Sequence, residues 1–131
     1  MNVGQTFSKE EKLKSKKIIG KIFAEGSSVS KYPLRLIYLE TDLPKDVKIQ
    51  AAVSVAKRHV KLASKRNRIK RLMREAYRKN KHLIFNNIET SYAFMFLYLG
   101  KDELSFAQLN TNMQLLLKKF LKNINDENDS Q

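Results

Sequence analysis

The chain has 131 residues, 42% of them hydrophobic, and no cysteine. This length and composition predict one globular domain with its own core, and the lack of cysteine excludes disulfides and cysteine-ligated zinc. Residues 1–7 carry no secretory signal and no apolar run approaches the ~20 residues of a membrane span, so we expect a cytoplasmic protein without a membrane partner. Lys and Arg outnumber Asp and Glu by 26 to 13, a formal net charge of +13. This excess favours nucleic acid as the partner.

The N-terminal third predicts a helix followed by strands. Ser15 is a suitable N-cap for a helix that runs to about Glu25, and Gly26 is a suitable C-terminal stop. Apolar residues at helical spacing give this helix a buried stripe, formed by Leu13, Ile18, Ile19, Ile22 and Phe23. Strands are predicted at 29–32, 34–40 and 48–55, with a loop at 41–47.

Most of the positive charge lies in one segment. Between Lys57 and His82 stand twelve Lys or Arg residues and a single acid, Glu75. A helix from about Ser64 to Asn80 would bury a narrow apolar stripe and place Asn67, Lys70, Arg71, Arg74 and Arg78 on and beside the opposite face. Ordinary solvated helices mix acids among their bases, and membrane-binding helices carry bulkier apolar faces, so these alternatives are less favoured than a phosphate-binding helix.

The last elements are a strand and a helix. Residues 92–98 predict a strand whose aromatic face, with Tyr92, Phe94, Phe96 and Tyr98, is either core or a platform for stacking bases, core being favoured. Ser105 and Gln108 form a capping box for a final helix that reaches Ile124. We expect residues 1–6 and 125–131 to be flexible. The fold class is therefore α/β (an α+β two-layer domain), in the order α-β-β-β-α-β-α.

Catalytic chemistry is not evident in the sequence. His59 and His82 both lie in the basic segment, the carboxylates are scattered without metal-ligand spacing, and the four glycines form no phosphate-binding loop. We therefore predict no catalytic residue and no metal ligand in this chain.

The basic segment resembles a known motif. The run KRNRIKRLMREAYR (Lys65–Arg78) is similar to the Arg-Asn-Arg motif of the bacterial ribonuclease P protein subunit. The stretch Thr6–Gly26 and the strand end Ser54–Arg58 also resemble that family, so the resemblance covers roughly residues 7–124. Many members carry a glycine just before the motif, whereas His59–Ala63 has none. The geometry of that loop is therefore left open.

The resemblance implies a fold and a function. The fold would be a four-stranded sheet packed by helices, like domain 2 of ribosomal protein S5. The partners would be the catalytic ribonuclease P RNA and the single-stranded 5′ leader of precursor tRNA, with no obligate protein partner. The RNA subunit would hold the Mg²⁺ ions and cleave the precursor, so the chain would be the protein subunit of an endoribonuclease.

The family's functional residues map onto positions in this chain. The RNA-subunit contacts would be Arg66, Asn67, Arg68, Lys70, Arg71 and Arg74, and the leader contacts would be Ile19, Phe23, Tyr38, Lys57 and Arg58, with a one-residue offset possible at Tyr38. Two competing functions are a structural RNA-binding protein, such as a ribosomal protein, and a DNA-binding protein that uses residues 64–80 as a recognition helix.

Overall fold

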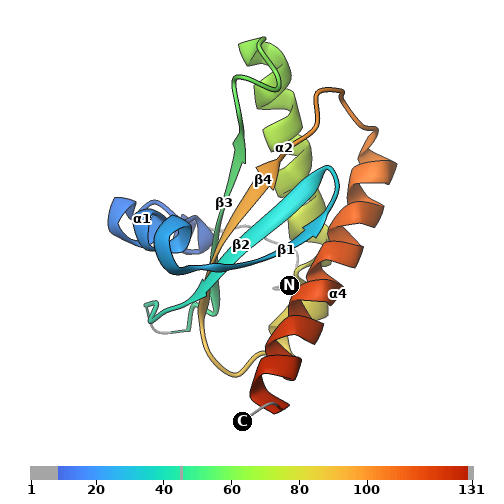
Figure 1. The fold of residues 1–131 in the computed structure, drawn as a ribbon. Coiled ribbons are helices and arrows are strands. Elements are labelled where there is room, and N and C mark those ends of the chain that lie inside the picture. The colour runs from blue at the N-terminus through green and yellow to red at the C-terminus, as the bar shows by residue number, and fades with distance from the viewer. Residues whose placement is uncertain (1–8, 45, 130–131) are drawn as a thin grey trace.

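The computed structural model describes residues 9–44 and 46–129. Its elements follow the predicted order, with a short 3-10 helix before the first helix and a one-turn helix after the basic one (Figure 1). Their bounds are η2 Lys9–Glu11, α1 Lys16–Glu25, β1 Ser27–Lys31, β2 Leu34–Glu40, β3 Ile49–Val55, α2 Ala63–Asn80, α3 His82–Phe85, β4 Tyr92–Tyr98 and α4 Phe106–Asp129.

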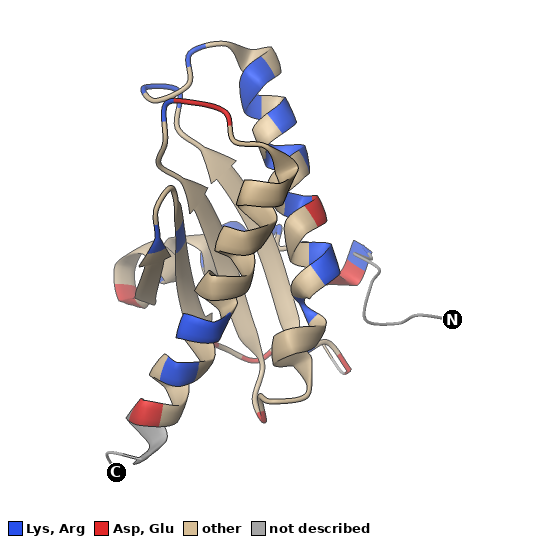
Figure 2. Ribbon diagram, turned by 90° about the vertical axis from the view of Figure 1, so that its right-hand side faces the viewer, with Lys and Arg blue, Asp and Glu red and all other residues tan. Residues whose placement is uncertain are grey.

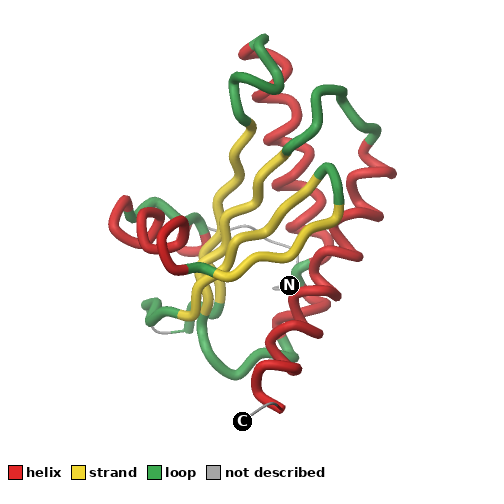
Figure 3. The backbone as a smooth tube through the Cα atoms, in the orientation of Figure 1, coloured by secondary structure: helices red, strands yellow, loops and turns green. Residues whose placement is uncertain are grey.

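The four strands form one sheet in the order β1-β2-β4-β3 (Figure 3). Strand β2 pairs antiparallel with β1 and β4, whereas β3 pairs parallel with β4. A parallel neighbour requires a crossover connection, and α2 with α3 provides it between β3 and β4. The basic helix is therefore held against the sheet by the chain on both of its sides.

Helices cover the two sheet faces unequally. The larger core lies between the sheet and α2, α3 and α4, and the smaller one lies between the sheet and α1. Figure 1 shows α1 and α4 on opposite sides of the sheet. The predicted two layers are thus the sheet with α2 and α4, and α1 adds a partial third layer. We call the face beneath α1 the outer sheet face.

The aromatic face of β4 is core. Phe94 and Phe96 are fully buried, and Tyr92 and Tyr98 are 8% and 1% exposed. The Tyr77 ring of α2 lies 5.2 Å from Phe96, and the Phe120 ring of α4 lies 4.9 Å from Phe94. These aromatic contacts leave no stacking surface for a base, so the platform alternative is wrong and the core prediction is confirmed.

Both ends of α1 are as predicted. The glycine that follows its C-terminal end is required because it has no side chain, and not because of its backbone conformation. The Ser15 hydroxyl accepts a hydrogen bond from the Ile18 amide at 3.2 Å, which is an N-cap. Gly26 has a φ of −70°, which any residue can adopt. A Cβ there would lie 2.5 Å from the Ile22 carbonyl oxygen and 2.9 Å from a methyl carbon of Ile37. Close approach between α1 and β2 therefore requires the glycine.

The N-terminal segment is fastened to the rest of the fold by a buried ion pair. Lys81 is fully buried, and its ammonium lies 2.6 Å from the Glu11 carboxylate. The same ammonium lies 5.5 Å from the centre of the Phe85 ring. The next residues follow β3, because the Leu13 amide donates to the Ala51 carbonyl at 3.0 Å. Lys81, counted in the basic segment by sequence, thus serves the fold.

The final helix begins as predicted and ends later. The Gln108 amide donates to the Ser105 hydroxyl at 3.2 Å, and the Ser105 amide donates to the Gln108 side chain at 3.1 Å, which confirms the capping box. Helix α4 continues to Asp129, so residues 125–129 are helical where a flexible tail was expected. Residues 1–6, 130 and 131, for which flexibility was also expected, lie outside the described residues.

Removing one member of the buried ion pair should destabilise the fold. Glu11→Gln leaves the buried Lys81 charge without its counter-charge, and we expect the free energy of unfolding in urea to fall by about 3 kcal/mol. The exposed neighbour Glu10 provides the matched control, because Glu10→Gln should change stability by less than about 0.5 kcal/mol. Equal, small effects of the two variants would contradict a structural role for the pair.

Candidate nucleic-acid interface

Helix α2 has the two faces that its sequence predicts. Ile69, Met73, Ala76 and Tyr77 are buried against the core. Asn67, Arg71 and Arg74 are exposed on the opposite side, and Lys70 is half-buried beside them. We call these four residues the cationic face. Figure 2 shows that Lys and Arg recur along the whole length of α2, in which Glu75 is the only acid.

The C-terminal end of α2 is locked to α4 by a buried amide network. The Asn80 side chain donates to the Ala76 carbonyl at 2.8 Å and to the Asn110 side chain at 2.6 Å. Gln114 donates back to the Asn80 side-chain oxygen at 3.1 Å. Buried polar groups with all their partners in place fix an orientation as well as a contact. The network therefore holds the helix rotation that presents the cationic face.

Arg66 stabilises the loop that precedes α2. Its guanidinium donates to the carbonyl oxygens of Val60 and Lys61 at 3.0 and 2.8 Å. The turn itself closes through His59 and Val60 amides that donate to the Ala56 carbonyl at 3.1 Å. Among the described non-glycine residues, only Asp46 has a positive φ, so this turn needs no left-handed residue. Loop 59–63 can therefore form without the family's glycine.

Two further arginines of the segment are paired with acids. Arg68 contacts both carboxylate oxygens of Glu103 at 3.2 Å, which joins α2 to the loop before α4. Arg78 lies 2.5 Å from Glu75. This hydrogen bond with Arg78 lowers the pKa of the Glu75 carboxyl, so Glu75 is ionised at neutral pH and offsets the charge of Arg78. Arg68 remains largely exposed, with 62% of its side chain accessible.

The six predicted RNA-subunit residues therefore fall into two groups. Lys70, Arg71 and Arg74 make no ion pair within the described residues and face outward with Asn67. Arg66 and Arg68 also have structural contacts. All six lie on one helix, so the fold brings them together as the motif implies.

The N-terminal segment adds two lysines to the surface beside the cationic face. Lys12 and Lys14 line a small hollow together with Arg74 and the β3 residues 51–53. Their position follows from the pairing of Lys12 and Leu13 with Ala51 of β3. Only this long-range pairing places these lysines beside α2, and no local pattern in the sequence signals it.

The two predicted leader residues of α1 differ in burial. Ile19 is half-buried against the outer sheet face. Phe23 is 56% exposed, so the prediction that it belongs to the buried stripe of α1 is wrong. The sheet opposite them contributes partly buried Ile37 and Leu97, so α1 covers this face incompletely. Lys57 and Arg58 are exposed just beyond the end of β3. The leader contacts of these four residues remain predictions.

Tyr38 does not belong to this group. It is 4% exposed and lies on the opposite sheet face, where its ring is 4.8 Å from Phe120 and its hydroxyl accepts a hydrogen bond from Asn123 at 2.6 Å. The prediction that it contacts the leader is inconsistent with this burial. The physical reason is strand alternation, because the residue facing α1 is its neighbour Ile37.

The remaining candidate groups form no metal site. Within residues 9–44 and 46–129, no group of three or more His, Asp or Glu side chains is arranged to hold a metal ion. His59 is half-buried and His82 is exposed. In the same residues, no helix combines the length and the apolar character needed to cross a bilayer.

Comparison with known proteins gives one consistent family. Residues 7–121 match the profile of the family described as Ribonuclease P. The chain is 38% identical over 120 residues to the ribonuclease P protein component of Porphyromonas gingivalis, covering 89% of this chain and 88% of that protein. It is 40% identical over 82 residues to that of Chlorobium phaeobacteroides, covering 59% and 55%.

Solved structures agree at the level of fold. The RNase P protein of Staphylococcus aureus superposes with a TM-score of 0.66 at 20% identity, over 84% of this chain and 94% of that one. The RNase P protein of Thermotoga maritima gives a TM-score of 0.66 at 21% identity, over 83% and 96%.

Unfolding measurements can distinguish the arginines that have structural contacts from those that are only exposed. Arg66→Ala removes two hydrogen bonds to loop carbonyls, so we expect it to lower the free energy of unfolding by about 1–3 kcal/mol. Arg71→Ala removes only an exposed side chain and should change stability by less than about 0.5 kcal/mol. Urea unfolding followed by circular dichroism measures both. A neutral Arg66→Ala would show that the loop does not depend on this side chain.

Proposed function

The chain belongs to the ribonuclease P protein family, and we propose that it is the RNA-binding protein subunit of ribonuclease P. In this proposal the cationic face binds the catalytic RNA, the outer sheet face binds the 5′ leader of precursor tRNA, and the RNA subunit cleaves. The observation that carries the proposal is the cationic face, which is held outward by a buried stripe and offset by no acid in the described residues.

The chemistry of the cationic face suits a folded RNA. Lys70, Arg71 and Arg74 span just over one helical turn, so they can reach neighbouring phosphates of one backbone. Each phosphate that they neutralise releases a condensed counterion, which supplies affinity without reading sequence. Lys12 and Lys14 extend this charge across the hollow beside Arg74. The partner favoured by this arrangement is a structured RNA with closely spaced phosphates.

The outer sheet face suits an unpaired strand. Phe23 offers an exposed ring on which one base can stack, which is worth about 1–3 kcal/mol. Ile37 and Leu97 supply partly buried apolar surface on the same sheet face as Ile19, and Lys57 and Arg58 supply charge just beyond the end of β3. A duplex would not place a base against Phe23, whereas a single-stranded leader can.

We assign the Mg²⁺ ions to the RNA subunit and the substrate. Phosphate oxygens and water are the ligands that Mg²⁺ prefers, and RNA provides them densely. The protein's cations would neutralise part of the same phosphate charge, so the assembled enzyme should need less Mg²⁺ than the RNA alone. This role in tRNA maturation places the protein in the cytoplasm.

The proposal is tested by cleavage of a precursor tRNA at low Mg²⁺, with the protein alone, a bacterial ribonuclease P RNA alone, and both together. We expect a mature 5′ end only in the mixture. Cleavage by the purified protein alone would overturn the assignment of chemistry to the RNA. Tight RNA binding without any effect on cleavage would instead indicate a structural RNA-binding protein.

Substitutions on the cationic face should weaken binding of the RNA subunit. For Arg71→Ala or Arg74→Ala, we expect the slope of log K against log salt to flatten by about one unit, because one phosphate contact is lost. Lys118→Ala removes an exposed cation from α4 and should leave the slope unchanged. Filter-binding titrations over a salt series measure this. The cationic face is not the interface if all these variants bind like the wild type.

Truncating Phe23 should impair leader recognition specifically. Phe23→Ala should lower the affinity of the holoenzyme for precursor tRNA by at least about fivefold and leave mature tRNA unaffected, because only the precursor has a base to stack. Leu115→Ala is the control, since it removes another exposed apolar side chain, from α4. An equal loss for precursor and mature tRNA would place Phe23 in the scaffold.

A further inference from the structure

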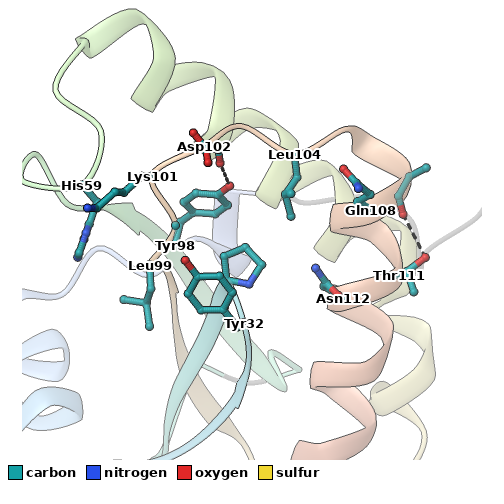
Figure 4. Close-up of a pocket in the computed structure, with 13 residues that line it drawn as sticks. Tyr32, His59, Tyr98, Leu99, Lys101, Asp102, Leu104, Gln108, Thr111 and Asn112 are labelled. Carbon is teal, nitrogen blue, oxygen red and sulfur yellow. Dashed lines mark hydrogen bonds between the residues drawn. The ribbon is translucent and has the colours of Figure 1, made fainter.

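A cavity of about 750 Å³ lies outside both surfaces described above. It opens between the Tyr32-Pro33 tip of the β1–β2 hairpin, the loop at 99–104 that follows β4, and the first turns of α4 (Figure 4). His59, from the loop before α2, lines its far side. Pockets for small organic ligands commonly have about 300–1,000 Å³, so this one can admit a nucleobase with its sugar.

An exposed aromatic ring forms one side of the cavity. Tyr32 is 73% exposed, the largest exposure among the exposed large hydrophobic side chains of the described residues. It comes from the hairpin tip and lies beside the ring of Tyr98 (Figure 4). A ring that stays in water adds no burial energy to the stability of the fold. It is, however, the surface on which a base stacks.

The wall behind Tyr32 is held in place by the backbone. The Leu99 amide donates to the Pro33 carbonyl at 2.7 Å, and the Tyr98 hydroxyl donates to the Asp102 carbonyl. A Cβ at Gly100 would lie 3.0 Å from Pro33 and 3.2 Å from the Tyr98 ring, so the glycine allows the loop to approach the hairpin this closely. These contacts hold the loop against the hairpin, so this side of the cavity is preformed.

The other sides carry polar and cationic groups suited to a nucleotide. Asn112 projects from α4 on the side of the cavity that faces Tyr32, and its amide can both donate to and accept from a base edge (Figure 4). Lys101 and His59 also line the cavity. Lys57 and Arg58, which directly precede His59 in the chain, are exposed. The Tyr32 ring suits the face of a base, the Asn112 amide suits the edge of the same base, and the Lys101 ammonium suits a phosphate.

We propose that this cavity binds one unpaired nucleotide of RNA, with its base stacked on Tyr32, its edge at Asn112 and its phosphate toward Lys101. The inference rests on the proposed function, because it needs an RNA partner at the adjacent surfaces. The nucleotide can come from the leader or from the RNA subunit.

The test compares Tyr32→Ala with Tyr32→Phe in the reconstituted holoenzyme. Loss of stacking in Tyr32→Ala should weaken binding by at least about fivefold, whereas Tyr32→Phe keeps the ring and should stay within about twofold. One arm measures affinity for the RNA subunit alone, and the other measures affinity for precursor tRNAs with short and long leaders. A loss in the first arm assigns the nucleotide to the RNA subunit, and a loss that appears only with long leaders assigns it to the leader.

Tryptophan fluorescence reports stacking on position 32 directly, without a comparison of affinities. The chain has no tryptophan, so Tyr32→Trp introduces a single indole that a stacked base should quench when RNA binds. Leu115→Trp, on α4 and outside the cavity, should not be quenched.

The proposal is overturned if Tyr32→Ala binds like the wild type in both arms, or if Tyr32→Trp is not quenched, while Arg71→Ala still weakens RNA binding. In that case the proposed function survives. If the wild-type protein itself binds neither RNA, both proposals fail.

Discussion

The burial of Phe94 and Phe96 between two helices determines where the cationic side chains point. Both rings are fully buried, with Tyr77 of α2 and Phe120 of α4 against them. Aromatic contacts of this kind add about 0.5–1.5 kcal/mol beyond the area that they bury, and they are sensitive to orientation. Rotating α2 to hide its arginines would expose Tyr77 and open the core. The core therefore fixes which side of the helix faces outward.

A helix with so many like charges also needs anchors that resist repulsion. Arg66 and Arg68 hold its N-terminal half through the loop carbonyls and Glu103, and Asn80 and Lys81 hold its C-terminal end through α4 and Glu11. The motif thus divides its basic residues between scaffold and surface. Arg71 and Arg74, near the middle, remain exposed between these anchors.

The sequence predicts features that depend on local periodicity, and it fails where distant segments meet. The two faces of α2, the Ser105 capping box and the strand 92–98 each follow from neighbouring residues, and all are confirmed. Tyr38 was assigned to the leader by its match to the family, with a one-residue offset left open. Alternation along β2 (LRLIYLE) could not decide between Tyr38 and its neighbours, because both faces of this strand carry apolar residues. Lys81 and Lys12 look like ordinary surface cations until long-range pairing places one beside Glu11 and the other beside Arg74.

The placement of β3 at the sheet edge links the two proposed RNA surfaces. Its edge carries the N-terminal segment with Lys12 and Lys14, next to Arg74 of the cationic face, and its end carries Lys57 and Arg58 beside the outer sheet face. Positive charge thus continues from α2 toward the outer face. An RNA on α2 and a leader under α1 would be held at a fixed separation by one strand. A rigid spacer of this kind adds specificity because it restricts how the two RNAs can approach, which charge alone cannot do.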